Sequence, residues 1–433
     1  MRIVEIIEKK KRSEALSQEE IEYVVQGSLS DEIADYQLSA FMMAVCFNGM
    51  NGEETWNLTC AMLDSGERAD LSGVEGVTAD KHSTGGVGDK TTLIVAPIAA
   101  ACGVKVPKMS GRVLGFTGGT VDKLEAIPGY RTDIPLGEFA RIVNAVGASV
   151  ISQSEALCYA DKKFYALRGV TATVDSVPLI VSSIMSKKLA VGAQCIVLDV
   201  KTGIGSFSPK FEDGVKLAKK MIYVGRRADK KVSAVVTDME QPLGLAVGNA
   251  LEVMEAAEVL KGRGPDDVAE LSIVLAAEML LLAGKGNEKR CLELARNALK
   301  NGSAFEKFKA MVKAHGGDAS VLDRKSGLLL SPLKREIKAL KDGWVRRVNA
   351  AELGKAASAL GAGRVKKDDV IDHGAGVLLS VKRGDYVRQG DTVATIYSSA
   401  ISKLNETEKA VQDAVVLTDV EPEKKPLILK VIR

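Results

Sequence analysis

Hydrophobic residues recur at helical spacing through the first part of the chain, most clearly between residues 33 and 45. Two segments, Ser17-Gln-Glu-Glu20 and Asn51-Gly-Glu-Glu54, have the form of capping boxes. In a capping box, a polar side chain and a glutamate three residues later satisfy backbone N–H groups at the start of a helix. The pattern therefore predicts a helical domain over residues 1–65.

The pattern changes beyond a glycine-containing linker at residues 66–80. Residues 91–102 are apolar over the length of a buried helix, and residues 160–192 are again helical in character. Short apolar runs at residues 193–200 and 232–237 are typical of buried strands. Strands separated by helix-length segments favour an α/β sheet, in which ligands bind at the strand ends.

The C-terminal part differs again, because short strand patterns alternate with Gly-Asp turns over residues 377–397. This arrangement resembles the barrel-sandwich of biotinyl and lipoyl carriers, but the lysine that a carrier needs at its hairpin tip is missing. We therefore favour a structural β module. The predicted fold class is α/β, with a helical domain of residues 1–65 completed by 160–192, a larger α/β domain of 66–159 continued by 193–335, and a C-terminal β-rich module of 336–433.

Composition and charge narrow the possible partners. A net charge of +3 over 433 residues gives no support to broad electrostatic binding of nucleic acid. We interpret the basic run Lys9-Lys10-Lys11-Arg12 as a solvated helix face. The 6 cysteines are scattered without a C-x-x-C pair, which indicates neither a disulfide framework nor a zinc site. We see no signal peptide and no run of about 18 apolar residues, so we expect a cytoplasmic protein without a membrane partner.

The segment from Asp80 to Thr92, DKHSTGGVGDKTT, is the first that indicates chemistry. Glycines let a backbone approach an anion, hydroxyls and lysine add donors, and a following helix presents its positive end. Phosphate is the ligand that this combination favours, although the segment could also be a tight structural turn. A Walker A loop is excluded, because that motif needs glycine where Asp89 and Thr84 stand.

A second segment, KMSGRVLGFTGGTVDKLE from Lys108 to Glu125, repeats this combination of hydroxyls, glycines and cations. The two segments resemble the phosphate loops of the thymidine and pyrimidine-nucleoside phosphorylases, the nucleoside phosphorylase family II. That family's signature contains Ser-Gly-Arg and then Thr-Gly-Gly-Thr-x-Asp-x-Leu-Glu. The resemblance extends to DKKFYALR at residues 161–168 and to TDMEQPLG at residues 237–244, and so covers essentially the whole chain.

The resemblance implies a pentosyltransferase, a pyrimidine-nucleoside phosphorylase that splits uridine, thymidine and deoxyuridine with phosphate and needs no organic cofactor. His82, Arg168 and Lys187 are the implied catalytic residues. His82 would lie near the base and sugar as a candidate proton donor, with a structural role in the loop as the alternative. The implied phosphate-binding residues are Lys81, Ser83, Gly85, Thr92, Lys108, Ser110 and Thr120, and the implied pyrimidine-binding residues are Arg168, Ser183 and Lys187.

These residue types suit phosphorolysis. Phosphate attacks the anomeric carbon while the base leaves with negative charge, so cations at the base carbonyls stabilise the transition state. Arg168 and Lys187 can supply that charge, although either of them alone would more often form a surface ion pair. We expect the base on the helical domain and phosphate on the α/β domain, in a cleft that excludes water.

Two positions of the second loop depart from the family pattern. Val113 replaces the glycine that usually follows Arg112, and a β-branched residue is poor at positive φ. Phe116 replaces a histidine. Both changes leave the phosphate donors in place and make the path of the loop and the sugar preference open questions.

A third departure concerns a metal. Lys90 stands where close bacterial relatives have threonine, within a potassium site that in the family also uses the positions of Gly88, Leu243, Ala246 and Glu255. We hypothesise that the Lys90 ammonium takes the place of the cation, pairs with Glu255 and removes the requirement for potassium.

Several alternatives stay open. Lys108 favours a broad pyrimidine enzyme, because strict thymidine phosphorylases tend to have an uncharged residue there. A thymidine-specific phosphorylase and a catalytically silent homologue carrying Phe116 are the nearest alternatives. Anthranilate phosphoribosyltransferase would need acidic magnesium ligands and lacks the C-terminal module.

The family is dimeric, so we expect a homodimer. A candidate dimer face is the stripe of Ile33, Gln37, Phe41, Ala44 and Val45, and core packing of this stripe is the alternative.

Overall fold

The computed structural model describes residues 1–112, 118–154, 156–324, 327–364 and 369–433. The chain divides into two compact units. The helical unit consists of Met1–Ser72, Gln153–Ile196 and Lys216–Val232, and the α/β unit consists of Gly73–Ser152, Val197–Val215 and Ser233–Arg433.

The helical unit begins with the helices that the sequence predicts. Both capping boxes are present, because the side chains of Ser17 and Asn51 accept hydrogen bonds from the backbone N–H groups of Glu20 and Glu54. The unit contains α1 (Ile3–Lys11), α2 (Gln18–Leu29), α3 (Asp35–Asn48), α4 (Gly52–Asp64), α8 (Tyr159–Arg168), α9 (Val177–Val191) and most of α10 (Phe211–Arg227).

The apolar stripe between residues 33 and 45 packs inward. Ile33, Phe41 and Val45 have no exposed surface and belong to the core that α1, α2, α4, α8 and α9 share with α3. Of the two interpretations of this stripe, core packing is therefore the correct one. Different apolar residues of α3 face outward: Tyr36 is 76% exposed and Phe47 is 82% exposed.

The basic run of α1 differs from its prediction at one position. Lys10 is buried, and its Nζ lies 2.7 Å from Oε1 of Glu54 on α4. Glu54 also accepts the backbone N–H groups of Leu16 and Asn51, so the buried carboxylate has three donors. A buried ion pair is tolerated when its remaining hydrogen-bonding capacity is satisfied in this way. The prediction of a solvated face is wrong for Lys10, whereas Lys11 and Arg12 are exposed.

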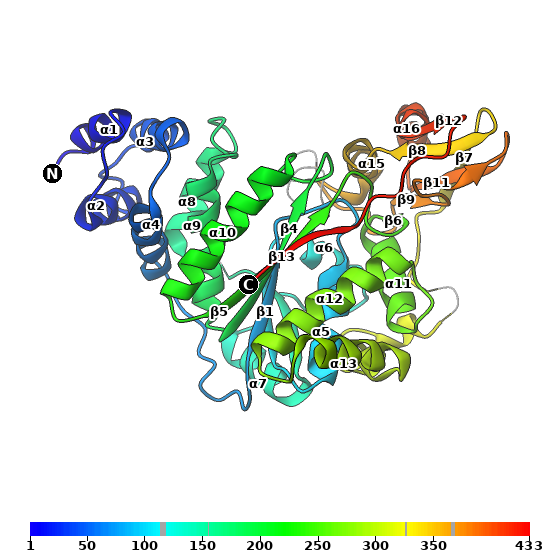
Figure 1. Cartoon of the computed structure of the whole chain (residues 1–433), viewed down its shortest axis with the longest axis horizontal. Helices are drawn as coiled ribbons and strands as arrows, with labels where there is room; N and C mark the ends of the chain where they lie inside the picture. Colours follow the sequence, from blue (N-terminus) through cyan, green and yellow to red (C-terminus); the bar gives the residue numbers. More distant parts are fainter. Residues whose placement is uncertain (113–117, 155, 325–326, 365–368) are drawn as a thin grey trace. The chain divides into compact units, whose positions relative to one another are not determined.

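The α/β unit contains a sheet in the order β1-β4-β5-β13. The strands predicted at residues 193–200 and 232–237 are confirmed as β4 (Cys195–Thr202) and β5 (Lys231–Asp238), beside β1 (Ala79–Ser83). The last strand, β13 (Ile428–Ile432), comes from the C-terminus and runs antiparallel to β5 (Figure 1). A parallel pair, β2 (Val106–Ser110) and β3 (Ala148–Ser152), lies beside β1.

Helices cover these strands. The helix predicted at residues 91–102 is α5 (Thr91–Ala101), which is buried from Thr91 to Ala100. Such a helix is apolar all round, because it has no solvent-facing side. The other helical segments of this region are α6 (Thr120–Glu125), α7 (Leu136–Val146), α11 (Asn249–Leu260), α12 (Asp266–Leu282), α13 (Glu288–Lys300), α14 (Ser303–Ala314) and the 3-10 turn η1 (Ala319–Leu322).

The C-terminal module has a core of its own. The predicted alternation over residues 377–397 is confirmed, because this stretch forms three short strands. One sheet has the order β10-β8-β12 and the other the order β6-β9-β11-β7. The second sheet includes one strand from an earlier part of the chain, β6 (Ala246–Val247). The other elements are β7 (Leu333–Lys338), β8 (Gly343–Val348), α15 (Ala350–Ala357), the π-turn η2 (Ser358–Ala362), β9 (Gly376–Leu379), β10 (Tyr386–Val387), β11 (Thr392–Ser398), α16 (Ile401–Ala414) and β12 (Val415–Thr418).

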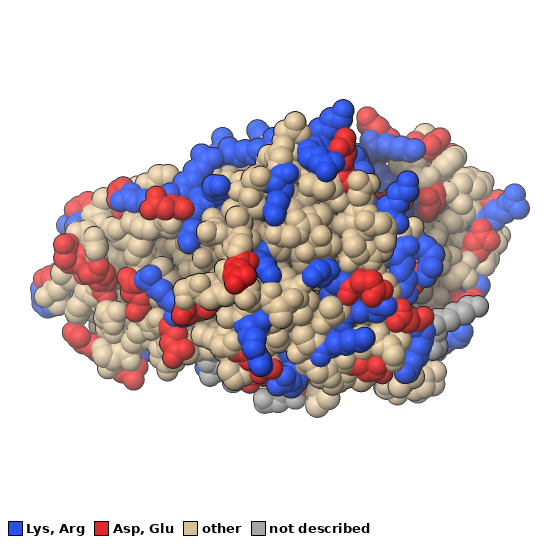
Figure 2. All heavy atoms as spheres, turned by 90° about the horizontal axis from the view of Figure 1, so that it is seen from below, with Lys and Arg blue, Asp and Glu red and all other residues tan. Residues whose placement is uncertain are grey.

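The surface carries charges of both signs. Figure 2 shows Lys and Arg side chains interspersed with Asp and Glu over the visible face. Within the described ranges, none of the helices has the length and apolar character needed to cross a membrane. All 6 cysteines are free thiols.

Candidate functional site

The carboxyl ends of three strands meet at one edge of the sheet. The backbone N–H of Thr84, just after β1, donates to the carbonyl of Asp199 on β4 at 3.0 Å. In return the N–H of Lys201 donates to the Thr84 hydroxyl at 2.9 Å. The Thr202 hydroxyl donates to the carbonyl of Thr237 on β5 at 3.1 Å. In α/β folds this edge is where ligands bind.

The first predicted phosphate loop starts from this edge and turns at two glycines. Gly85 and Gly88 have φ angles of +95° and +74°, which side chains rarely tolerate. A Cβ atom on Gly88 would lie 2.6 Å from the carbonyl oxygen of Leu243. The Ser83 hydroxyl accepts the N–H of Gly85 and donates to the carboxylate of Asp89. The loop therefore has a fixed shape before α5 begins.

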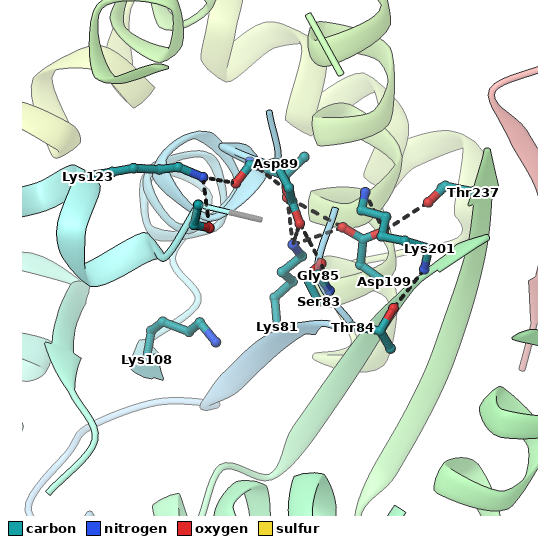
Figure 3. Close-up of polar contacts among 12 residues, drawn as sticks. Lys81, Ser83, Thr84, Gly85, Asp89, Lys108, Lys123, Asp199, Lys201 and Thr237 are labelled. Carbon is teal, nitrogen blue, oxygen red and sulfur yellow. Dashed lines mark hydrogen bonds and ion pairs between the residues drawn. The ribbon is translucent and has the colours of Figure 1, made fainter. Parts of the chain in front are cut away.

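A buried charge cluster lies beneath this loop (Figure 3). Asp199 is wholly buried between two lysines: its Oδ2 lies 2.9 Å from Nζ of Lys81, and its Oδ1 lies 2.8 Å from Nζ of Lys201. Lys81 also donates to the hydroxyl of Thr91 at 2.6 Å. Burial by itself lowers the pKa of Lys81, but the carboxylates of Asp199 and Asp89 outweigh it, so the pKa is raised and Lys81 stays an ammonium ion.

Asp89 is the second carboxylate of the cluster. Burial by itself raises the pKa of Asp89, but Lys81, Lys201 and Lys123 outweigh it and hold the pKa well below its usual range. The carboxylate accepts the backbone N–H of Thr91 at 3.1 Å, at the start of α5. Asp89 is therefore a permanent anion that fixes the loop to the helix.

The residues predicted on the second loop lie at the ends of β2 and α6. Thr78 and Lys105 form a parallel bridge, so β1 and β2 run in the same direction. Lys108 on β2 is buried, with its Nζ 3.9 Å from Oδ1 of Asp80. Figure 3 shows its side chain directed towards the region around Lys81.

The remaining residues predicted for phosphate belong to the same unit. Ser110 ends β2, Thr92 lies in the first turn of α5, and Thr120 begins α6. Val113 and Phe116 lie outside the described residues. His82 follows Lys81 on β1 and is half-buried.

The residues predicted to bind the pyrimidine belong to the helical unit. Lys187 lies one turn after Ser183 on α9, and its Nζ contacts the Ser183 hydroxyl at 3.0 Å. The same ammonium lies 2.6 Å from Oδ2 of Asp161 on α8. Arg168, at the end of α8, is buried and donates to the carbonyl of Val174 at 2.6 Å, and burial lowers the pKa of Arg168. For Arg168, the alternative of a surface ion pair is therefore wrong.

Lys90 lies at the start of α5 with its ammonium wholly buried. Its Nζ donates to the carbonyls of Leu243 and Ala246 at 2.8 and 3.0 Å and to the carboxylate of Glu255. Burial by itself lowers the pKa of Lys90, but Glu255 outweighs it, so the pKa is raised. The backbone of Gly88 accepts the N–H of Lys90 at 2.9 Å. The structure thus brings together all five residues that the sequence associates with a cation.

Sequence reasoning missed the partners of these lysines. Asp199 and Lys201 are charged residues within β4, a strand that is buried at all 8 positions and otherwise mostly apolar. Charged residues at the carboxyl end of a buried strand are a signal that could have found them. Lys123 and Glu252 form another buried pair, 2.8 Å apart, for which spacing along the chain gives no signal.

Three families match consecutive parts of the chain. The "Glycosyl transferase family, helical bundle domain" matches residues 4–66, and the "Glycosyl transferase family, a/b domain" matches residues 75–305. The "Pyrimidine nucleoside phosphorylase C-terminal domain" matches residues 344–418. The chain is also 51% identical over 400 residues to the pyrimidine-nucleoside phosphorylase of Geobacillus stearothermophilus, covering 92% of each protein. The chain belongs to the pyrimidine-nucleoside phosphorylase family.

Further relatives agree with this assignment. The identity is 50% over 403 residues to the pyrimidine-nucleoside phosphorylase of Bacillus subtilis (strain 168), again covering 92% of each protein. Among solved structures, anthranilate phosphoribosyltransferase from Thermus thermophilus matches with a TM-score of 0.59 and 20% identity, covering 71% of this chain and 98% of that chain. At this identity the likeness shows a shared fold alone. The match of the C-terminal module favours the phosphorylases over this alternative.

Replacing Asp199 with asparagine tests the charge balance of the buried cluster. We expect the free energy of unfolding to fall by about 3–5 kcal/mol at neutral pH, because buried ammonium groups lose their main counter-charge. Without Asp199, less negative charge opposes the effect of burial, so the folded-state pKa of Lys81 falls relative to wild type. The loss of stability should therefore shrink as the pH rises through the alkaline range and Lys81 gives up its proton. Urea unfolding of wild type and variant at neutral and alkaline pH measures this, and a loss independent of pH contradicts the explanation.

Proposed function

We propose that the chain catalyses the reversible phosphorolysis of uridine, thymidine and deoxyuridine to the free pyrimidine base and ribose or deoxyribose 1-phosphate. The observation that carries the proposal is the buried ammonium of Lys81 under a glycine loop that leads directly into α5. Such a loop offers an anion backbone N–H groups, a fixed cation and the positive end of a helix. Membership of the pyrimidine-nucleoside phosphorylase family supports the choice of a pyrimidine nucleoside as the second substrate.

In this proposal the α/β unit binds phosphate. Lys81 is held by Asp199, so its ammonium would contact both the Asp199 carboxylate and the bound phosphate. Its positive charge is then balanced by the two anions together. The hydroxyl of Ser83 lies at the loop turn, where it can exchange its bond to Asp89 for one to phosphate. The proposed phosphate ligands are Lys81, Ser83, Gly85, Thr92, Lys108, Ser110 and Thr120.

The helical unit binds the pyrimidine in this proposal. Lys187 and Arg168 place two cations where negative charge develops on the leaving base, and Ser183 adds a hydroxyl. Asp161 fixes the direction of the Lys187 ammonium, and backbone carbonyls fix the Arg168 guanidinium. His82 supplies a proton to the departing base. Because both cations are oriented before substrate arrives, little reorganisation is needed in the transition state.

Incubation with uridine, thymidine or deoxyuridine, with and without phosphate, tests the proposal through the release of free base. We expect phosphate-dependent release from all three. Lys187→Gln should lower kcat by about 10²–10³-fold, as loss of one donor to a developing anion does. Lys163→Gln on α8 is the matched control, because Lys163 pairs with Asp31 and Asp35 at the surface and should leave kcat unchanged.

Each other outcome of this assay selects an alternative. Release from thymidine alone indicates a thymidine-specific phosphorylase. No release from any nucleoside, in a folded protein, indicates the catalytically silent homologue. Release from purine nucleosides alone contradicts the substrate assignment.

We further propose that Lys90 replaces a potassium ion. Two carbonyls and a carboxylate are ligands for a hard cation, and the Lys90 ammonium already lies within hydrogen-bonding distance of all three. A potassium ion therefore does not fit beside the ammonium in this position. We expect equal activity in sodium-only and potassium buffers. Lys90→Thr empties the position, and its activity should become dependent on potassium. A strong potassium stimulation of the wild-type chain contradicts the proposal.

We also propose that the chain forms a homodimer. Support comes from the exposed apolar side of α3, where Tyr36, Ala40, Met43 and Phe47 recur at helical spacing. Light scattering coupled to size exclusion should give twice the mass of 46.0 kDa. Phe47→Asp should yield monomer, whereas Leu329→Asp in the α/β unit, at a position 93% exposed, should not. A monomeric wild type contradicts the proposal.

Three expectations from the sequence stay predictions: a cytoplasmic location, the absence of a nucleic-acid partner and the absence of a membrane partner. The mixed charge on the face in Figure 2 supports the second of these.

A further inference from the structure

We infer that Lys123 is a positioning residue that ties the two phosphate loops together through one buried ammonium group. The inference rests on the proposed phosphate-binding role of the loops. Lys123 lies on α6, three residues after Thr120, and none of its side chain is exposed. It touches neither substrate in the proposed function, so any effect on the reaction must pass through the loops.

Among the described residues, the Lys123 ammonium has two hydrogen bonds and one ion pair. Nζ of Lys123 donates to the backbone carbonyl of Asp89 at 2.7 Å and to that of Gly118 at 3.4 Å. It also lies 2.8 Å from Oε2 of Glu252 on α11. The two carbonyls and the carboxylate belong to three separate segments of the α/β unit. Figure 3 shows the Lys123 side chain reaching to Asp89.

The two carbonyls lie where movement would disturb the phosphate donors. Asp89 holds the first loop, because its carboxylate accepts the hydroxyl of Ser83 and the N–H of Thr91. Gly118 precedes Thr120 by two residues at the end of the second loop. A bond from one ammonium to both carbonyls therefore fixes the distance between the first loop and the start of α6, where Thr120 lies.

The absence of a side chain at Gly118 is independent support for the close approach. A Cβ atom there would lie 3.2 Å from Cε of Lys123 and 3.4 Å from its Nζ, which is tighter than ordinary contact. The backbone at Gly118 thus lies directly against the lysine. A side chain at this position would therefore require the lysine to shift.

Glu252 anchors the ammonium to a part of the fold outside both loops. Its other oxygen, Oε1, accepts the N–H of Gly248 at 3.2 Å, just before α11. The carboxylate is 1% exposed, so the ion pair is shielded from solvent and little weakened by salt. Lys123 is therefore held at a fixed place, and both loops take their position from it.

The inference predicts a specific kinetic change. The double variant Lys123→Met/Glu252→Gln removes both buried charges and leaves neither unpaired. We expect its KM for phosphate to rise by about 10- to 100-fold, since a misplacement of about 1 Å can cost that much. The KM for uridine should stay unchanged, because the proposed base ligands belong to the helical unit. The rise in melting temperature that phosphate causes in the wild-type chain should shrink in parallel.

A matched control exists in the helical unit. Lys10 and Glu54 form a buried ion pair of the same kind, 2.7 Å apart, with no phosphate loop attached. The double variant Lys10→Met/Glu54→Gln should leave the KM for phosphate unchanged. Gly118→Ala is a second test that keeps every charge, and we expect it to raise the KM for phosphate as well.

Three outcomes would overturn the inference: an unchanged KM for phosphate in folded Lys123→Met/Glu252→Gln or in Gly118→Ala, an equal rise in the KM values for phosphate and uridine, or the same rise in the control. Failure of the proposed function looks different. In that case wild type releases no base, and thermal stabilisation by inorganic phosphate decides the role of Lys123. Stabilisation of wild type but not of the variant supports the inference, and equal stabilisation of both overturns it.

Discussion

The ion pairs of Asp199 with Lys81 and Lys201 are the interaction on which the site depends. A strand buried on both faces is normally apolar, and two charged side chains at its end are tolerated only because they compensate each other and the lysine on β1. The arrangement holds the Lys81 ammonium beneath the glycine loop without solvent. The sheet sets the position of the Lys81 ammonium, and the loop above it supplies the hydroxyls and backbone N–H groups of the proposed phosphate site.

Buried lysines recur around this cluster in three different uses. Lys81 is the lysine that we propose binds phosphate, Lys90 is bonded to two carbonyls and Glu255, and Lys123 joins segments of backbone. In each case a carboxylate supplies the counter-charge, which keeps the flexible side chain in one direction. A buried lysine without such a partner would lose its proton or turn towards solvent. The carboxylates thus hold all three lysines in place.

Local sequence signals predicted much of this architecture. Capping boxes, the apolar helix α5 and the two buried strands were recognisable because each depends on neighbours in the chain. The inward packing of Phe41 was one of two open alternatives and the burial of Lys10 was not predicted, since both depend on distant partners. At the site, the glycine loops and Lys90 were predicted from motifs. Asp199, Lys201 and Glu252 were missed, because their partners come from other elements and spacing along the chain does not indicate them.

The pairing of β6 with β9 has a consequence for the C-terminal module. Ala246 and Val247 pair with Leu378 and Val377, and the N–H of Leu379 donates to the carbonyl of Leu245 at 2.8 Å. This pairing immobilises the same short segment whose carbonyls surround the Lys90 ammonium. Because Lys90 precedes α5, the module helps to hold the start of this helix in place. It contributes no side chain to the proposed chemistry. The main chain therefore connects the sheet of the module directly to the residues that accept the Lys90 ammonium.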